Sequence, residues 1–440
     1  MKMIAKQLTV AIALAIFTLP AFSQKEKIQF YRPADQKGIN AFETAKTDTV
    51  EFNGLKVKVG GNFTQQFQSL KHSNTSTPEV KLYPLTTGFN LATANLNFDI
   101  QLEDGIRVSL ENYMSSRHHS EFWVKGGYIQ VDKLPMFGNP EWFTKYLTVK
   151  IGHFMPNYGD QHFRRSDNGN TIMNAFVGNY IMDAFTTEIG GEVYVRPINN
   201  VFVMLGMNAG IINGDVKEAY YPTGNPQAGE VLKKSPSIYA KAGYDSQISD
   251  DLRVRLTGSI YTNAGTTRNT LYAGDRTGSR YYMVVEAENA TTAANFTSGQ
   301  INPAFQHKVT AISINPFVKF QGLEVFGTYE MASGIKQLPA GPTPDSRSFN
   351  QLAGEVVYRF FPREQVFVGA RYNKVSGTLD AATPYDISID RIQIAAGWFA
   401  TKNMLLKLEY VTQNYKDFAA TDIRNGAKFS GIMLEAAIGF

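Results

Sequence analysis

The sequence predicts an all-β chain: a transmembrane, up-and-down antiparallel β-barrel of sixteen strands. Three observations support this prediction. Segments of roughly ten residues alternate apolar and polar side chains, as expected for strands whose two faces meet different surroundings. Short turns and long polar connections follow one another in alternation along the chain. After Ser23 no apolar run is long enough for a membrane-spanning helix.

The N-terminal residues have the features of a secretory leader. Lys2 and Lys6 are followed by the apolar run 8–17, and small residues precede Gln24. This order predicts a signal peptide over residues 1–23, removed before Gln24. The chain has no cysteine, so disulfides and thiolate metal sites contribute nothing to it.

Residues 24–53 form a different region, mixed and polar, without a sustained period. We interpret them as an N-terminal extension on the periplasmic side. The two-residue alternation starts just after this region and continues to the end of the chain, so the predicted barrel comprises residues 54–440.

The clearest strand pair flanks Glu103-Asp104-Gly105, a hairpin turn signal. Apolar residues from Ala92 to Leu102 and from Ile106 to Leu110 alternate with polar ones on both sides of this turn. The same unit recurs down the chain. The predicted strands are 55–70, 88–102, 106–114, 121–132, 145–155, 185–196, 201–210, 236–245, 252–262, 309–320, 323–331, 350–361, 366–374, 387–399, 404–413 and 429–440.

The asymmetry of the connections favours an outer-membrane barrel over a soluble sandwich, which would need no such asymmetry. Short turns are then expected at the periplasm and long loops outside. The last strand fits this arrangement, because Ile438 and Phe440 lie on one apolar face that would meet lipid. A terminal aromatic strand also resembles the assembly signal of bacterial outer-membrane proteins.

A barrel of sixteen strands is wide enough for an aqueous lumen rather than a core of side chains. By the predicted register, the basic residues that face inward include Arg107, Lys150, Arg253 and Arg255. Inward basic residues slightly outnumber acidic ones, and charged rings set the ion preference of a pore. The pattern predicts a weak anion preference; a salt-bridged wall without selectivity is the alternative.

The long connection 156–184 carries Arg164-Arg165 followed by an apolar and aromatic run. It is longer than an ordinary connection. A loop with this apolar content is expected to fold onto the barrel instead of standing in water.

The stretch LTVKIGHFMPNYG (147–159), a strand leading into Gly-x-Phe-x-Pro, resembles the phosphate-selective porin O/P family. The segment 31–44 (YRPADQKGINAFET) resembles porins of Bacteroidota. The resemblance implies a passive outer-membrane channel for anions, often trimeric. The chain lacks a dense run of basic loop residues, which argues against strict phosphate selectivity.

In general porins the third loop folds into the barrel and narrows it. By this resemblance we expect Arg164 and Arg165 at a constriction, where guanidinium groups favour anions. The alternative is that the loop packs on the inner wall and its arginines face an acidic cluster such as Glu188 and Glu192.

An enzyme is not expected. Asp160-x-His162 is the one pair that suggests a water-activating site, and no nucleophile elbow, phosphate loop or metal motif is present. The sequence therefore predicts no catalytic residue, no cofactor and no metal. Basic residues are scattered among strands, so nucleic acid is not an expected partner.

The expected partners are outer-membrane lipid and small hydrophilic or anionic solutes. A homotrimer and an assembly with other outer-membrane proteins stay open. A second hypothesis is a non-conducting barrel that serves as a subunit or scaffold of such an assembly. It draws on the connection 263–308, where Tyr281, Tyr282, Val284 and Val285 could form an extra hairpin, and on the aromatic turn 136–143 (MFGNPEWF).

Overall fold

A computed structural model describes residues 27–90, 92–115, 119–212, 216–336, 338, 341–380 and 383–440. The predicted signal peptide, residues 1–23, lies outside the described residues. None of the helices in the described part of the chain is long and apolar enough to cross a membrane.

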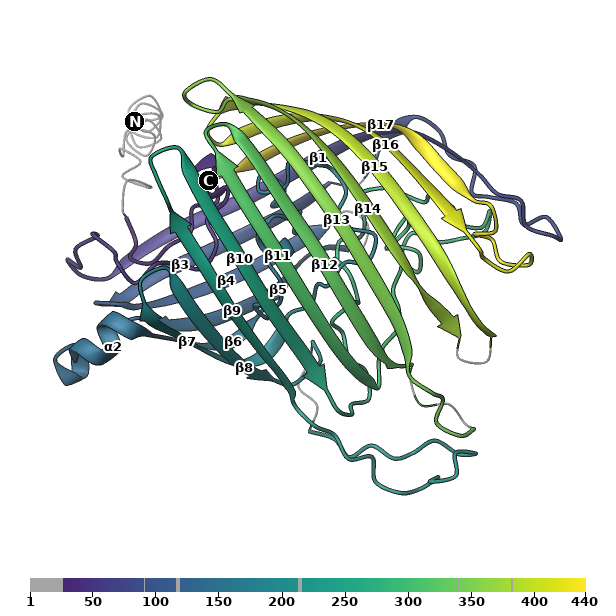
Figure 1. Ribbon diagram of the computed structural model, residues 1–440, viewed down its shortest axis with the longest axis horizontal. Helices are drawn as coiled ribbons and strands as arrows, with labels where there is room; N and C mark the ends of the chain where they lie inside the picture. Colours follow the sequence, from purple (N-terminus) through teal and green to yellow (C-terminus); the bar gives the residue numbers. More distant parts are fainter. Residues whose placement is uncertain are drawn as a thin grey trace, which may run out of the picture.

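The strands form one closed antiparallel sheet (Figure 1). β1 (Lys56–Ser73) pairs with β17 (Lys428–Gly439) on one side and with β3 (Thr93–Glu103) on the other, which closes the barrel. β2 (Gly88–Phe89) is a two-residue strand beside β1, so sixteen strands make the wall. The others are β4 (Ile106–Ser115), β5 (His119–Val131), β6 (Leu147–Phe154), β7 (Glu188–Ile198), β8 (Val201–Asn208), β9 (Ser237–Gln247), β10 (Leu252–Asn263), β11 (Lys308–Phe320), β12 (Leu323–Ile335), β13 (Arg347–Phe360), β14 (Val366–Asp380), β15 (Thr383–Thr401) and β16 (Met404–Lys416).

This architecture confirms the predicted fold class, and each predicted segment overlaps one strand of the wall. The largest differences lie at the long-loop end. There β14 continues to Asp380 and β15 begins at Thr383, several residues beyond the predicted limits. At this end the backbone pairing continues through polar residues. Apolar and polar side chains no longer alternate there, so the sequence pattern does not mark the strand.

The segment 136–143 was expected to be a turn, but it contains two short helices. The 3-10 helix η2 (Pro135–Phe137) is followed by α2 (Glu141–Tyr146), which leads directly into β6. Glu141 in the first turn and Lys145 in the last suit the helix dipole. A helix of six residues is too short to show a helical period in the sequence.

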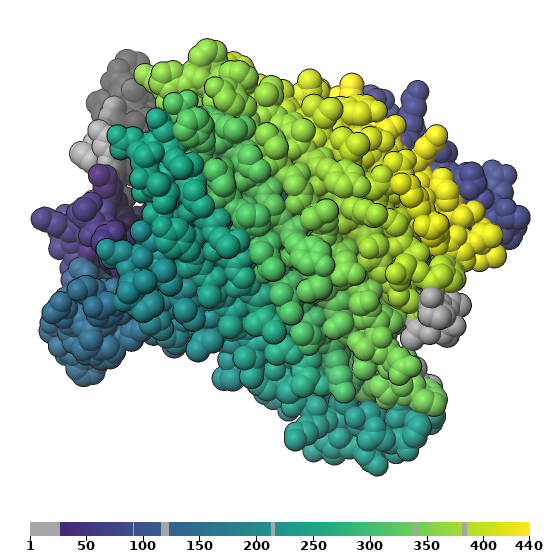
Figure 2. Space-filling view, in the orientation of Figure 1, coloured from purple at the N-terminus to yellow at the C-terminus, as the bar shows by residue number. Residues whose placement is uncertain are grey.

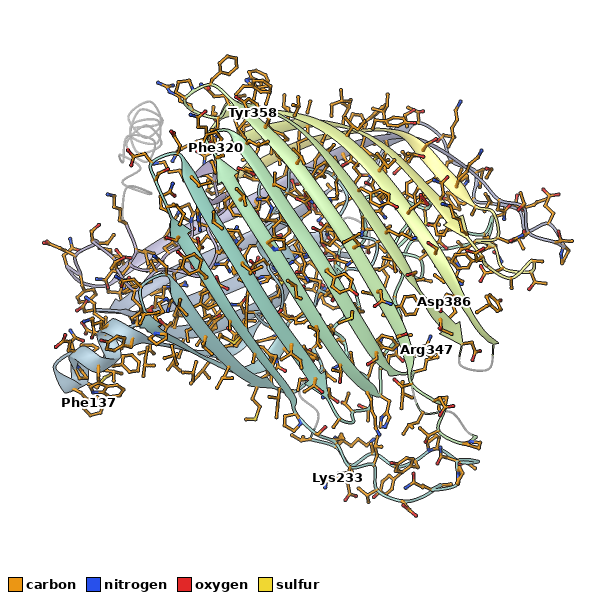
Figure 3. The ribbon with its side chains drawn as sticks, viewed as in Figure 1. Phe137, Lys233, Phe320, Arg347, Tyr358 and Asp386 are labelled. Carbon is orange, nitrogen blue, oxygen red and sulfur yellow. The ribbon has the colours of Figure 1, made fainter. Side chains whose placement is uncertain are left out.

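The outer face of the wall is apolar. The inner face is polar, and segments of the same chain cover it. Along β13 the inward residues Gln351 and Glu355 are buried, while the outward residues Leu352, Val356 and Tyr358 are exposed. Figure 2 shows a continuous outer wall, and Figure 3 marks Phe320 and Tyr358 at its short-turn end. An exposed apolar band of this kind is what a lipid-facing barrel requires.

The lumen is occupied by three segments of the chain itself. We call them the strap (residues 27–46), the third loop (155–187) and the long loop (264–307). Most side chains of the third loop are buried. The strap, coloured purple in Figure 1, lies at the short-turn end, near the C-terminus.

Candidate pore and its lining

The strap crosses the mouth of the barrel at the short-turn end. Gln29 bonds to the β3–β4 hairpin, where its Oε1 accepts from the Gly105 amide at 2.8 Å. Farther along, Asp35 pairs with Lys402 at 3.0 Å, and the Gln36 amide donates to the Lys402 carbonyl at 2.8 Å. These contacts tie the strap to the β3–β4 and β15–β16 turns, which lie on either side of the β17–β1 closure.

The second half of the strap is held by ionic contacts within the lumen. The Glu43 carboxylate lies 2.6 Å from Arg255 Nη2 and 2.9 Å from Lys241 Nζ, and it also accepts from Asn157 Nδ2 at 2.9 Å. Burial alone would raise the pKa of Glu43, but Lys241 and Arg255 outweigh it and hold the pKa well below its usual range. Phe42 packs edge-on against Phe317. The strap is therefore a packed part of the barrel.

The third loop packs on the inner wall of β13 to β16, and its residues 167–170 reach across the lumen to β3 and β5. Backbone amides of Val177, Ile181 and Met182 donate to Glu409, Asn373 and Gln351, side chains of β16, β14 and β13. In return, Lys407 of β16 donates to three carbonyls of the loop. A non-helical backbone can lie at this depth only with such partners, because each unpaired polar group in an apolar setting is costly.

The long loop lies beside the third loop and contacts both β15–β16 and, on the other side of the lumen, β3 and β5. The Tyr281 hydroxyl donates to Glu409 at 2.7 Å, and Arg391 donates to the Gly299 carbonyl at 2.6 Å. The extra hairpin considered for this loop is not formed: its described residues contain no strand, only an isolated bridge between Ala287 and Leu82. Its apolar residues Val284 and Val285 are instead buried in a hydrophobic cluster inside the barrel.

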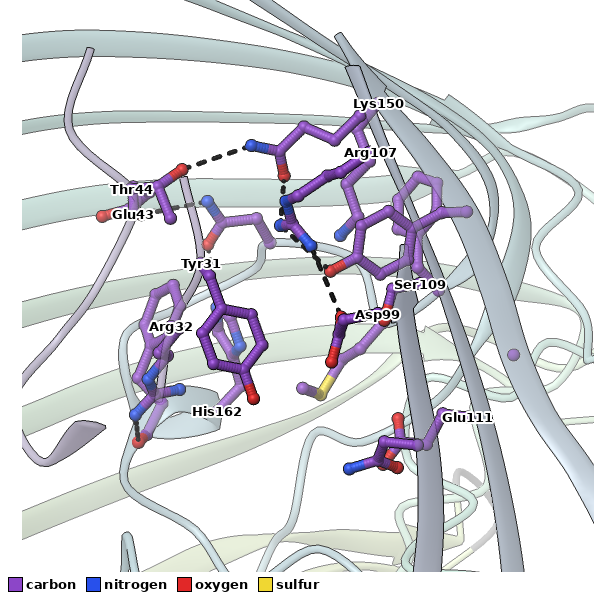
Figure 4. A pocket seen from close by; sticks show the side chains of 18 of the residues that line it. Tyr31, Arg32, Glu43, Thr44, Asp99, Arg107, Ser109, Glu111, Lys150 and His162 are labelled. Atoms are coloured by element: carbon purple, nitrogen blue, oxygen red, sulfur yellow. Dashed lines mark hydrogen bonds and ion pairs between the residues drawn. The ribbon is translucent and has the colours of Figure 1, made fainter. Parts of the chain in front are cut away.

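A cavity of about 300 Å³ lies between the β3–β7 wall and the two segments that face it, the strap and the third loop. The wall contributes residues of β3 to β7, and the opposite side comes from the strap and the third loop. Figure 4 shows Tyr31, Arg32 and His162 on one side and Arg107 and Lys150 on the other. This cavity is therefore off-centre in the lumen, against one arc of the wall.

A row of polar side chains crosses this arc. Register pairs Arg107 with Gln130, Gln130 with Lys150, and Lys150 with Glu192 on neighbouring strands. Arg107 donates to Gln130 Oε1 at 2.7 Å. Since side chains alternate along each strand, the four residues share the lumen face. The sheet thus places two cations, Arg107 of β4 and Lys150 of β6, on either side of Gln130 of β5.

Carboxylates compensate these two cations only loosely. Arg107 lies 3.8 Å from Asp99, and Lys150 lies 3.7 Å from Glu192. Glu192 already accepts from the Asn157 amide and from the Tyr194 and Tyr239 hydroxyls. The Lys150 ammonium instead sits 3.9 Å from the Phe154 ring centroid. The wall of the cavity therefore presents positive charge that its own carboxylates leave partly uncompensated.

His162 lies on the facing side of the cavity. Its Nε2 is 2.8 Å from Asn157 Oδ1, which also accepts from Lys241 Nζ at 2.8 Å. Burial, followed by the positive charge of Lys241, lowers the pKa of His162 well below its usual value. The other charged groups around it are Glu43, which opposes the shift, and Arg32 and Lys150, which add to it.

Stability is expected to fall as the pH drops below about 6.5, the pKa of an unperturbed histidine. Below that value the unfolded chain binds a proton at His162 that the folded chain does not bind, because its folded-state pKa is lowered. The expected slope is at most about 1.4 kcal/mol per pH unit for this one group. Urea unfolding of the refolded barrel at pH 7.5, 6 and 5 measures it. The variant His162→Gln should lose stability less steeply; equal slopes would contradict the assignment.

The cations predicted from the sequence occupy two kinds of place. Arg107 and Lys150 line the cavity. The other four are held in ion pairs away from its wall row: Arg164 with Glu324 and Glu355, Arg165 with Asp183, Arg253 with Asp245, and Arg255 with Glu43, Asp160 and Asp245. Neither Arg164 nor Arg165 pairs with Glu188 or Glu192. A role of these four residues in selectivity stays a prediction.

The C-terminal residues lie where the last strand closes on β1. Ile438 and Phe440 are exposed on the outer face, and the Phe440 amide donates to the Gly61 carbonyl at 3.0 Å. Their role as an assembly signal stays a prediction.

The strap residues Tyr31, Arg32, Glu43 and Thr44 line the cavity, and sequence reasoning did not select them. They stand in a stretch without periodicity, and the partners of Glu43 are more than a hundred residues away in the chain. Glu43 was the one available signal. The predicted inward face carried more basic than acidic residues, so an acidic residue in the N-terminal extension could have been expected to pair with one of them.

No catalytic pairing forms at Asp160 and His162. Asp160 accepts from Arg255 and Thr257, whereas His162 bonds to Asn157. Among the described residues, no group of three or more His, Asp or Glu side chains is arranged to hold a metal ion.

Comparison with solved structures finds the same fold in outer-membrane channels. The anion-selective porin of Comamonas acidovorans aligns with a TM-score of 0.52 at 11% identity, over 88% of this chain and 100% of that one. The channel DcaP of Acinetobacter baumannii aligns with 0.50 at 10% identity, over 88% and 98%. OprB of Pseudomonas putida aligns with 0.50 at 10% identity, over 88% and 94%. No family model matches the chain, and no curated protein matches it in sequence. At these identities the likeness shows the fold: a closed β-barrel of the outer-membrane porin type.

Proposed function

We propose that this chain is an outer-membrane porin, a passive channel for small hydrophilic solutes with a weak preference for anions. The observation that carries the proposal is the cavity between the β3–β7 wall and the strap, lined by loosely compensated cations. Solutes would pass along this arc of the wall, between it and the strap and third loop that face it. The likeness to porins in fold supports the assignment.

Anion preference is assigned to Arg107 and Lys150. Both face the cavity, and an anion beside them would meet charge that no carboxylate within 3.5 Å neutralises. We assign Arg164, Arg165 and Arg255 to holding loops in place, because their guanidinium groups are already committed to buried carboxylates.

The test is a planar-bilayer measurement of conductance and reversal potential in a salt gradient. The double variant Arg107→Gln/Lys150→Gln is expected to lose most of the anion preference and to keep an open channel. The matched control, Lys416→Gln/Lys428→Gln, removes the same charge from exposed positions at the long-loop end. Equal shifts in both variants would show that the preference reflects net charge and not the cavity. Replacing chloride by phosphate in the same cell then decides whether phosphate is favoured among anions.

A second function is favoured by the filling of the lumen. Three segments of the chain occupy it, and the remaining cavity is small for a barrel of this width. A non-conducting barrel that serves as a subunit of an outer-membrane assembly would look the same. It predicts a folded, silent protein that co-purifies with other proteins in mild detergent, whereas the porin would be isolated alone or as a homotrimer.

A further inference from the structure

An exposed apolar ledge projects from the barrel at the short-turn end. It consists of Met136, Phe137, Trp142 and Tyr146, from η2 and α2, and the first three are 63%, 75% and 60% exposed. Figure 2 shows this unit as a separate blue lobe, and Figure 3 marks Phe137 at its tip. Large apolar side chains gathered on one exposed surface generally mark a contact with lipid or protein.

The ledge is firmly attached to the barrel. Lys133, at its base, pairs with Asp104 of the β3–β4 hairpin at 2.8 Å, and Asn139 donates to the same carboxylate at 3.1 Å. On the inner side Phe143 is buried, with the Lys46 ammonium 5.8 Å from its ring centroid. Trp142 and Phe143 meet edge to face. The exposed side chains are therefore presented by a fixed scaffold.

Exposed aromatic residues stand at the short-turn end over part of the wall, and the ledge belongs to the arc that lacks them. From β9 to the C-terminus, exposed aromatic residues stand on the outer face near this end: Tyr244, Phe320, Tyr358, Phe360, Trp398 and Phe440. In the described residues of β3 to β8, the exposed apolar side chains near the same end are aliphatic, namely Leu102, Ile129, Ile198 and Val203. The aromatic residues of this arc come instead from α2 and η2.

From this distribution we infer that the ledge lies in the headgroup region of the lipid leaflet on the short-turn side. Trp and Tyr favour that depth, because their rings combine an apolar body with a polar atom. The exposed Lys145 lies beside the aromatic side chains, and an ammonium group there is attracted to lipid phosphates. The inference rests on the membrane-spanning fold and is independent of whether the barrel conducts.

Tryptophan fluorescence tests this directly, since the chain has three Trp residues: Trp123, Trp142 and Trp398. The variant Trp123→Phe/Trp398→Phe keeps Trp142 as the single reporter. Refolded into vesicles of phospholipid brominated near the headgroup, its emission is expected to be quenched about as strongly as that of the matched variant Trp123→Phe/Trp142→Phe. That variant keeps Trp398, which stands on a lipid-facing strand.

Two further outcomes would overturn the inference. Emission from Trp142 that is quenched by aqueous iodide and unaffected by brominated lipid would place the ledge in water. Emission that neither agent quenches would place it in a contact with protein, a second copy included. Folding of each variant is checked separately by circular dichroism, so a loss of quenching cannot be confused with a loss of fold.

Discussion

Removal of strap residues 27–46 is expected to raise single-channel conductance severalfold. The strap crosses the mouth and forms one side of the remaining cavity, so its loss joins that cavity to the space at the short-turn end. Lys241 and Arg255 keep a carboxylate partner in Asp160, at 2.6 and 2.8 Å, which limits the damage to the wall. Bilayer recordings of the refolded variant, compared with the intact chain under the same salt, measure the change.

The control keeps the length of the chain and removes the contacts. Residues 27–46 are replaced by a Gly/Ser sequence of equal length, which has no side chains to bond with Gly105, Lys402 or Arg255. This variant should conduct like the deletion, with more current noise from the loose segment. If both variants kept the conductance of the intact chain, the strap would not narrow the path. If both were silent yet folded, the third and long loops alone would close the barrel.

Much of the fold was predictable because a barrel wall repeats one physical pattern. Each strand separates an apolar outer face from a polar inner one. The alternation in segments such as 404–413 therefore predicted both the strand and which of its side chains point into the lumen. Inward placement of Arg107, Arg255 and Lys407 followed from that register alone. Helix α2 could not be predicted in this way, because its six residues make fewer than two turns and show no helical periodicity.

The candidate pore was predictable only in part. The wall residues Arg107 and Lys150 came from the alternation of β4 and β6. The position of the strap could not be predicted. It is held by individual contacts, such as the ion pair of Glu43 with Arg255, and such contacts produce no periodic pattern in the sequence. The apolar content of the third loop predicted that it would pack on the barrel. The partners of Arg164 and Arg165 depend on which wall the loop lies against, and that is a property of the closed barrel.

Replacing Arg165 by Ala is expected to lower the free energy of unfolding by about 3–5 kcal/mol, the cost of leaving a buried carboxylate without its partner. Arg165 Nη2 lies 2.6 Å from Asp183, both side chains are buried, and the guanidinium stacks 3.8 Å from the Phe185 ring centroid. Asp183 stands in the apolar part of the third loop. The variant should therefore also loosen this loop, seen as added noise in the open-channel current. Denaturant unfolding of the refolded barrel measures the stability.

The matched control is Arg424→Ala, which breaks an ion pair of nearly the same length in a partly exposed loop. Arg424 Nη2 lies 2.7 Å from Asp422, with both side chains reached by solvent. A pair of this kind contributes only about 0–1 kcal/mol, so the two variants should differ by several kilocalories per mole. The double variant Arg165→Ala/Asp183→Ala should recover part of the loss, because no charge is then left unpaired. The contrary outcome is an Arg165→Ala variant with unchanged stability and a reversal potential shifted toward cations. It would show that the Arg165 guanidinium acts on the solute and sets selectivity, and that it does not hold the loop.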